Sequence, residues 1–364
     1  MKKALYFFQY LPPWRIDIFN GMAQEFDLTV VFFNADAEGF TYNREALLGR
    51  LQGVRTEFLT TGFRIKDRPV RLGVSKLIRK YEPEVVYVHE YSPVSLELAY
   101  LKRCFGYRLY VTTSDNLAMA RGVGGLKSLA RRTVLRHADG VVLYSHAVEA
   151  FYRELFPGLK TAVCPNIQRP ETLLAFRDAF PAIAEADEVR FRLDGKRVVL
   201  YVGRLVPVKG LDLLLPSFAR TAPDDAVLVL VGEGESRDML ERMAETLGVM
   251  DRIRWVDYRD GAGLYAWYER ADFVVLPSRY EPFGAVVNEA LVFGCPVVVS
   301  DRIGALDFMD GRNGIVFDPL DSQAFDRALN EAFDRFRDRS SHENLMPCTF
   351  DYYLHQLIDI EKDD

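Results

Sequence analysis

The sequence predicts an α/β protein built around two parallel β-sheets. Short apolar runs alternate with amphipathic helical patterns along most of its 364 residues. Apolar runs bounded by turn residues are typical of strands buried on both faces, and helices between such strands imply parallel βαβ units. Hydrophobic residues make up 49% of the chain and charged residues 27%, so the chain can bury two sizeable cores.

The expected strands form two groups of five, separated by a polar stretch. Residues 165–195 contain three prolines and end in Asp194-Gly195, just before a strong strand. The expected strands are 4–9, 28–33, 85–89, 108–112 and 140–144, then 197–202, 226–231, 253–256, 273–276 and 296–299. We therefore expect two Rossmann-like domains at 1–168 and 196–345, a linker at 169–195, and a segment at 346–364 whose aromatic helix packs back on the first domain.

Composition excludes several classes of protein. The formal net charge of -6 and the pI of about 5.6 argue against a basic nucleic-acid binder, so no nucleic-acid partner is expected. Cys104, Cys164, Cys295 and Cys348 lack CxxC spacing, which argues against a zinc site and a disulfide framework and fits a reducing cytoplasm. No stretch approaches the ~18 apolar residues of a spanning helix. We expect a cytoplasmic protein that at most lies on the inner face of the plasma membrane.

The first candidate binding loop follows strand 197–202. It carries Gly203, Arg204 and Lys209 before a helix that starts near Leu211. Two cations and a helix N-terminus at one place suit a diphosphate. The alternative is an ordinary strand-to-helix loop whose cations point at water.

A second candidate loop follows strand 273–276, and a helix begins near Gly284. This glycine permits close backbone approach, and the N–H groups of the first helical turn can receive phosphate oxygens. Glu281 precedes the helix and Glu289 lies two turns into it, so the two carboxylates suit different hydroxyl groups of one ligand. The alternative is one acidic residue favoured by the helix dipole and one surface glutamate.

Together these motifs resemble the family 4 retaining glycosyltransferases of the GT-B fold. The family carries a Glu, seven residues and a second Glu, preceded by Pro-Ser and followed by Gly-x-Pro-Val-Val. In this chain these are Glu281, Glu289, Pro277-Ser278 and the run from residue 294 to residue 298. The resemblance extends from about residue 199 to residue 319, with several motifs in the right order and at the right intervals.

The resemblance implies roles for the residues of both loops. Arg204 and Lys209, next to Gly203, would bind the donor diphosphate and stabilise the leaving nucleotide. Glu281 would hold the sugar hydroxyls and Glu289 the ribose, while the backbone N–H groups of Phe283 and Gly284 would meet the sugar and phosphate. The first domain would bind the acceptor and the second the donor. No acidic pair of the DxD type follows a strand, so we expect neither a metal nor a cofactor.

The first domain resembles the family more weakly and offers three candidate substrate residues. His89 ends a strand and is either a cleft residue or a structural histidine. Asp115 stands where many relatives place a histidine near the sugar. Arg15 lies at an expected helix start and is either a partner for an anionic acceptor or an ordinary surface residue.

Residues 125–137 form one further candidate surface. On a helix, their basic and apolar residues would make a surface able to lie on an anionic membrane. The alternative is an amphipathic helix with its apolar side on the sheet. The basic residues are Lys127, Arg131, Arg132 and Arg136, and the apolar ones are Leu126, Leu129, Ala130, Val134 and Leu135.

The resemblance thus implies a retaining, metal-independent hexosyltransferase. Its donor is expected to be a nucleotide sugar, with a UDP-sugar favoured and GDP-mannose next. Its acceptor is expected to be a glycan or a lipid-linked molecule of cell-surface polysaccharide or glycoconjugate synthesis. Two alternatives are a GT-B nucleotide-sugar epimerase and a non-catalytic module that binds sugar nucleotides or glycans.

Overall fold

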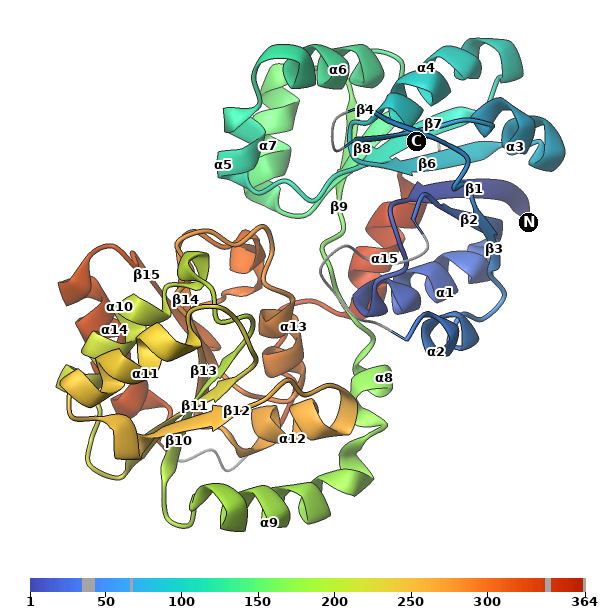
Figure 1. The fold of residues 1–364 in the computed structure, drawn as a ribbon. Coiled ribbons are helices and arrows are strands. Elements are labelled where there is room, and N and C mark those ends of the chain that lie inside the picture. Colours follow the sequence, from blue (N-terminus) through green and yellow to red (C-terminus); the bar gives the residue numbers. More distant parts are fainter. Residues whose placement is uncertain (35–42, 66–67, 338–341, 363–364) are drawn as a thin grey trace. The chain divides into compact units, whose positions relative to one another are not determined.

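The computed structural model describes residues 1–34, 43–65, 68–337 and 342–362, and it divides into two compact units. The first unit comprises Met1–Gln168 together with Thr349–Asp364, and the second comprises Arg169–Cys348 (Figure 1). Each unit contains its own parallel sheet. The predicted fold class, two Rossmann-like parallel sheets with helices between the strands, is confirmed.

The sheet of the first unit has seven parallel strands in the order β3-β2-β1-β6-β7-β8-β9. The chain builds β1, β2 and β3 in one direction and then returns to the other side of β1, so the strand order reverses between β1 and β6. A separate antiparallel hairpin, β4 (Gly62–Ile65) with β5 (Arg68–Arg71), follows β3. The sheet strands are β1 (Lys2–Phe8), β2 (Phe26–Phe32), β3 (Arg55–Phe58), β6 (Val85–His89), β7 (Arg108–Thr112), β8 (Gly140–Leu143) and β9 (Lys160–Val163).

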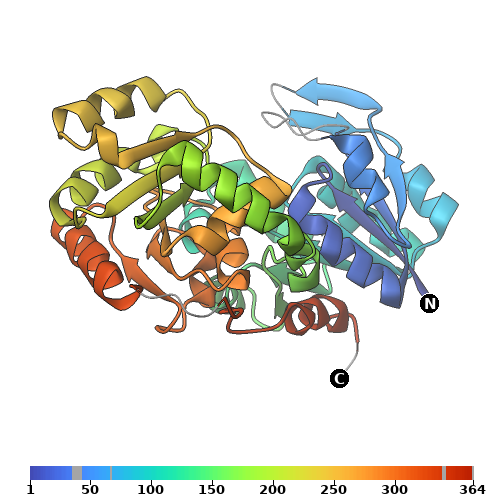
Figure 2. The same cartoon turned by 90° about the horizontal axis from the view of Figure 1, so that it is seen from below.

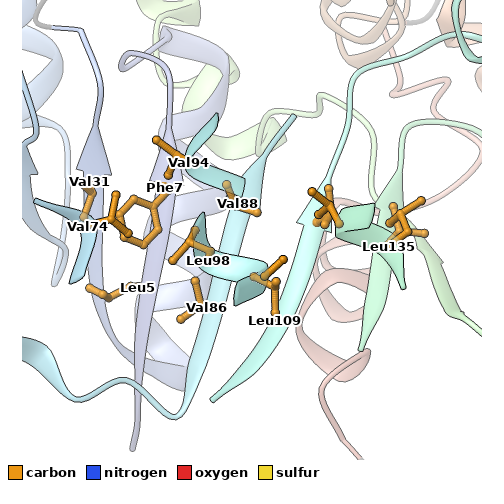
Figure 3. Packing of buried hydrophobic residues seen from close by; sticks show 14 of the residues in the cluster. Leu5, Phe7, Val31, Val74, Val86, Val88, Val94, Leu98, Leu109 and Leu135 are labelled. Atoms are coloured by element: carbon orange, nitrogen blue, oxygen red, sulfur yellow. The ribbon is translucent and has the colours of Figure 1, made fainter. Parts of the chain in front are cut away.

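Helices cover both faces of this sheet because alternate strand residues point to opposite sides. Leu5 and Phe7 of β1 pack in a buried apolar cluster with residues of α3, α4, α6 and α7 (Figure 3). Tyr6 points to the other face, where its ring packs edge-on against Phe19 of α1. The helices are α1 (Ile16–Glu25), α2 (Arg44–Gly49), α3 (Val74–Tyr81), α4 (Pro93–Phe105), α5 (Leu117–Gly122), α6 (Gly125–Leu135), α7 (His146–Leu155) and α15 (Phe350–Asp359), with a 3-10 turn η1 (Pro13–Arg15) before α1.

The helix α15 belongs to the first unit although it follows the second unit in the chain. It packs against α1 and β9, and the hydroxyl of Tyr87 on β6 donates to the carbonyl of Leu357, 3.3 Å away. Just after the helix, the buried carboxylate of Glu361 pairs with Lys2 at 2.9 Å and with Arg108. The predicted return of the C-terminal helix to the first domain is confirmed.

The sheet of the second unit has six parallel strands in the order β12-β11-β10-β13-β14-β15, so its order reverses between β10 and β13. Helices α10, α11 and α14 pack together, and α12 packs with α9 and α13; α9 runs beside α12 in both views (Figure 1, Figure 2). The strands are β10 (Arg197–Val202), β11 (Ala226–Val231), β12 (Ile253–Val256), β13 (Phe273–Leu276), β14 (Val297–Ser300) and β15 (Gly314–Phe317).

The helices of the second unit begin in the segment 169–195, which we expect to be a linker. That segment forms α8, η2 and α9 and lies within the second unit. The helices are α8 (Pro170–Leu174), α9 (Phe180–Phe191), α10 (Leu211–Thr221), α11 (Arg237–Thr246), α12 (Gly261–Arg270), α13 (Ala285–Val292) and α14 (Ser322–Arg335). The 3-10 turns are η2 (Arg177–Ala179), η3 (Pro207–Lys209), η4 (Met250–Arg252) and η5 (Gly304–Phe308). In the part of the chain that the structure describes, every helix is too short or too polar to cross a membrane.

Candidate active site

Two loops of the second unit meet where its strand order reverses. One follows β10 and spans 203–210, and the other follows β13 and spans 277–284. Open α/β sheets bind their ligands outside the carboxyl ends of the strands at such a reversal. The predicted donor residues of both loops therefore lie at the edge of the sheet where a ligand is expected.

The close approach of the two loops depends on glycine. Gly210 has a φ of 71°, and a Cβ atom on it would lie 2.2 Å from the carbonyl oxygen of Pro277. A side chain would be strained by this φ and would collide with the neighbouring loop. Gly203, the first residue after β10, donates its N–H to the carbonyl of Val231 at 3.0 Å, which ties the start of the loop to β11.

Lys209 and Glu281 are brought together by these loops. The ammonium group of Lys209, at the end of η3, forms an ion pair with the carboxylate of Glu281. The side chains are only 17% and 13% exposed, so the pair is largely screened from water. The Glu281 N–H donates to the carbonyl of Arg302 at 3.2 Å, which fixes the backbone that carries the carboxylate. The structure thus places side by side a cation and a carboxylate that the sequence assigns to adjacent parts of one donor.

Arg204 lies on the exposed side of the same loop. Its backbone carbonyl accepts a hydrogen bond of 2.9 Å from the hydroxyl of Tyr201 on β10. Burial raises the pKa of Tyr201, the negative charge of Glu281 raises it further, and the positive charge of Arg204 opposes this. Both charged groups therefore act on the same buried phenol, which indicates that they share one electrostatic environment.

An ion pair that the sequence analysis missed braces the loop of Lys209. The guanidinium group of Arg279 donates to both carboxylate oxygens of Asp212 on α10, at 2.6 and 2.7 Å, and to the carbonyl of Pro207 at 3.0 Å. The N–H of Arg279 also donates to the carbonyl of Val208 at 2.9 Å. Bonding to Arg279 lowers the pKa of Asp212. The bidentate pair holds the second loop against the turn that carries Lys209.

The second loop ends at the N-terminus of α13. Gly284 caps this helix with a φ of 98°, a left-handed conformation that favours glycine. Phe283 is buried, its ring meets Phe308 edge-on, and its carbonyl accepts from the N–H of Ala305 at 2.9 Å. The positive end of the α13 dipole therefore lies in the same loop as Glu281.

Glu289 lies further along α13 and is half-buried. One of its carboxylate oxygens accepts a hydrogen bond of 2.8 Å from the hydroxyl of Tyr268, a fully buried residue of α12. No local sequence pattern points to Tyr268, because the contact joins residues 21 positions apart on two different helices. Among the described residues, His, Cys, Asp and Glu form no cluster of three that could hold a metal ion.

The comparison with known families agrees with this arrangement. Residues 183–343, which contain both loops, match the family model described as glycosyl transferases group 1. The second unit is therefore a group 1 glycosyltransferase domain. The neighbours among solved structures share the GT-B fold of this chain.

The similar proteins differ in how much of each chain is matched. An uncharacterized glycosyltransferase of Methanocaldococcus jannaschii is 38% identical over 38% of this chain and 37% of its own length. A GDP-mannose-dependent alpha-(1-6)-phosphatidylinositol monomannoside mannosyltransferase of Mycolicibacterium smegmatis is 28% identical over 74% of this chain and 75% of its own. The solved structure of Anabaena HepE in complex with UDP covers 98% of both chains, with 19% identity and a TM-score of 0.70.

The first unit buries the three candidate substrate residues. Arg15 is 1% exposed, which excludes the surface-residue interpretation. Its guanidinium group lies 5.1 Å above the ring of Tyr144 and donates to the hydroxyl of the same residue. His89 stacks on Phe8 with ring centres 4.2 Å apart, and its Nδ1 is 3.0 Å from the hydroxyl of Thr112. Burial, with the charge of Arg15, lowers the pKa of His89 to about 3, so the imidazole is neutral.

Asp115 shares its surroundings with Glu90, which the sequence analysis did not select although it directly follows β6. Glu90 has a φ of 65°, and its carboxylate accepts from the N–H and the hydroxyl of Ser114 at 2.8 and 2.7 Å. Burial raises the pKa of Asp115 to about 6, the charge of Glu90 raises it too, and Arg131 opposes the shift. The carboxyl ends of β6 and β7 therefore hold two acidic groups that influence each other.

The helix α6 has two different sides. Arg131, Val134 and Leu135 are buried against the unit, as the amphipathic-helix alternative expects. Leu126 and Leu129 are 85% and 62% exposed. Lys127, Arg132 and Arg136 are exposed as well. Arg131 therefore does not belong to the basic surface that the sequence predicts, whereas the other three cations do.

Proposed function

We propose that this chain is a retaining, metal-independent glycosyltransferase that transfers a sugar from a nucleotide-sugar donor to a glycan or a lipid-linked acceptor. The observation that carries the proposal is the juxtaposition of Lys209 and Glu281 at the strand reversal of the second unit. A cation for the diphosphate and a carboxylate for the sugar hydroxyls are both required next to the bond that breaks.

The chemistry follows from the charge that develops during transfer. The sugar carbon becomes cation-like while the diphosphate leaves with its bonding electrons. Preorganised positive charge near the phosphates stabilises that state without a metal. In this proposal Arg204, Lys209 and the N-terminus of α13 supply that charge, and Glu281 orients the sugar.

The stereochemical part of the proposal comes from the family resemblance. Retaining glycosidases use one carboxylate as a nucleophile and another as an acid. Glu281 is assigned to sugar hydroxyls and Glu289 to the ribose, so neither is available for the nucleophilic role. We therefore propose front-face attack by the acceptor hydroxyl, on the side from which the diphosphate departs.

The donor and the setting are also proposals. We favour a UDP-sugar, with GDP-mannose next, and a role in cell-surface polysaccharide or glycoconjugate synthesis. The similar proteins include both a GDP-mannose-dependent enzyme and a protein solved with UDP, so both bases belong in any screen.

We also propose that α6 places the protein on an anionic membrane surface at the cytoplasmic face of the plasma membrane. Leu126 and Leu129 would enter the headgroup region, and Lys127, Arg132 and Arg136 would meet anionic lipids. A lipid-linked acceptor would then be presented at the surface where the enzyme binds.

A donor screen tests the proposed function. Nucleotide sugars with UDP and GDP are first ranked by the rise in thermal midpoint that they cause, because a ligand that binds only the folded state stabilises it. Turnover with acceptors is then followed in excess EDTA, and the anomeric configuration of the product is read by NMR. We expect an unchanged rate in EDTA and retained configuration.

Three outcomes would contradict parts of the proposal. Loss of activity in EDTA that Mg²⁺ or Mn²⁺ restores would assign the leaving-group role to a metal. An inverted product would exclude front-face attack. Release of free nucleotide without an acceptor would favour the epimerase alternative, and binding without turnover would favour the non-catalytic module.

A further inference from the structure

A buried tyrosine on α12 holds the carboxylate that is assigned to the donor ribose. Tyr268 is fully buried, and its ring stacks on Phe293 with ring centres 6.1 Å apart and planes inclined by 13°. Its hydroxyl donates to Oε2 of Glu289 at 2.8 Å. The ring is held in the core of the unit, which sets the direction from which its hydroxyl reaches Glu289.

The contact matters because a glutamate on a helix is otherwise mobile. Ordering such a side chain costs conformational entropy, because a long charged side chain loses many rotamers. A carboxylate already held by a hydrogen bond has lost that freedom before the ligand arrives. Less conformational entropy is then lost on binding, and the ligand binds more tightly. Burial raises the pKa of Tyr268 well above its ordinary range, so the hydroxyl keeps its proton and continues to donate.

We propose that Tyr268 is a positioning residue for nucleotide binding: it fixes Glu289 in the orientation that receives the ribose hydroxyls of the donor. This inference rests on the proposed function, because it takes the role of Glu289 from it. The tyrosine itself does not contact the ligand and acts only through the carboxylate.

The test is the variant Tyr268→Phe, which removes one hydroxyl and keeps the ring that stacks on Phe293. We expect UDP or GDP, whichever binds the parent, to bind about tenfold more weakly in a calorimetric titration, the loss of one hydrogen bond to a charged group. With a saturating donor, kcat should change less than twofold while KM for the donor rises about tenfold. Tyr107→Phe is the matched control, since Tyr107 is equally buried and donates to the carbonyl of Leu98 in the first unit.

A double-mutant cycle separates positioning from a merely structural role. In a Glu289→Gln background, Tyr268→Phe should change nucleotide affinity little further, because the group that it positions is already altered. Equal losses in both backgrounds would overturn the proposal. If Tyr268→Phe did not fold, Glu289→Asp, which withdraws the carboxylate from the phenol, would have to weaken nucleotide binding at least as much.

The remaining outcomes distinguish a failure of the positioning role of Tyr268 from a failure of the proposed donor site. A parent that binds nucleotide and a Tyr268→Phe variant that binds it equally well would overturn the positioning role alone. A parent that binds no nucleoside diphosphate would overturn the proposed donor site and the positioning role with it.

Discussion

The two units share a topology but present different chemistry at the carboxyl ends of their strands. In the second unit, Lys209 and Glu281 lie on loops that glycines allow to approach each other, and each side chain keeps some exposure. In the first unit, Arg15, His89 and Asp115 are each less than a tenth exposed and contact other groups of their own unit.

The two units therefore differ in how far residue type alone predicts the chemistry at the carboxyl ends of the strands. Lys209 and Glu281 form an ion pair between two loops of the second unit, so their residue types predict the chemistry there. At a buried edge desolvation decides the protonation state, as it does for the neutral imidazole of His89 and the raised pKa of Asp115. Similar residue types therefore predict function in one unit and leave it open in the other.

The largest expected effect concerns the cations of the second unit. Arg204→Ala and Lys209→Ala should each lower turnover by about 10²-fold or more, because each removes preorganised charge from the leaving group. Both should fold normally, as judged by circular dichroism and thermal midpoint. Arg237→Ala, in the same unit but at the start of α11, is the control and should keep its activity. Near-normal turnover of both loop variants would contradict the assignment of Arg204 and Lys209 to the donor diphosphate. The contrast between the two units would then lose its support.

The next effect separates the two glutamates. Glu281→Gln should depress turnover strongly while free nucleoside diphosphate binds nearly as well as to the parent. Glu289→Gln should weaken nucleotide binding itself, by roughly 1–3 kcal/mol. Calorimetric titration of UDP and GDP into both variants measures the difference. A reversed pattern would mean that the donor lies in the opposite direction along α13.

A smaller effect is the pH dependence of stability that the buried Asp115 of the first unit should cause. The pKa of Asp115 rises from 3.8 to about 6 in the folded chain, so between these values the folded chain binds more protons than the unfolded chain. Its contribution to stability is therefore complete below pH 3.8 and is lost as the pH rises to about 6. Relative to the parent, Asp115→Asn should gain on the order of 1 kcal/mol per pH unit in this window.

Urea unfolding of the parent and of Asp115→Asn at pH 4, 5, 6 and 7 measures that difference. Asp224→Asn, at an exposed aspartate of the second unit, is the matched control. Parallel curves for the parent and Asp115→Asn would show that the carboxyl group titrates as it does in water, and the contrast between the units would weaken.

The smallest effect concerns the exposed side of α6. Each of Lys127→Gln, Arg132→Gln and Arg136→Gln should weaken co-sedimentation with anionic vesicles about fivefold, near 1 kcal/mol per charge, and added salt should weaken it further. Neutral vesicles should bind the parent poorly. Arg242→Gln, an exposed cation of the second unit, is the control. Binding that ignores these changes would leave α6 as a helix that serves only to cover its sheet.

The sequence predicted the central strands well because a strand buried on both faces must be continuously apolar. The two edge strands of the first sheet were missed for the same reason: β3 consists of Arg-Thr-Glu-Phe and β9 begins with a lysine, so neither shows a long apolar run. An edge strand meets a neighbour on one side only and tolerates polar residues.

Within the candidate site, the family resemblance predicted that both loops serve one donor, but it did not predict the partners of their side chains. The pairs Arg279 with Asp212 and Tyr268 with Glu289 join residues 67 and 21 positions apart. The burial of Arg15 was equally hidden, because Tyr144, which receives its hydrogen bond, lies 129 residues away. Such contacts depend on tertiary packing, which local patterns do not encode.

The position of α15 has a consequence for the order in which the protein is completed during synthesis. Residues 169–348 leave the ribosome before α15, so the second unit can finish folding while the first still lacks a helix. Until then, the face of the first sheet that receives Leu354, Leu357 and Ile358 is open to water and to other chains. The first unit, whose synthesis starts first, is thus the last to finish folding. A fragment that ends at residue 168 would lack α15, keep this apolar face exposed and tend to aggregate.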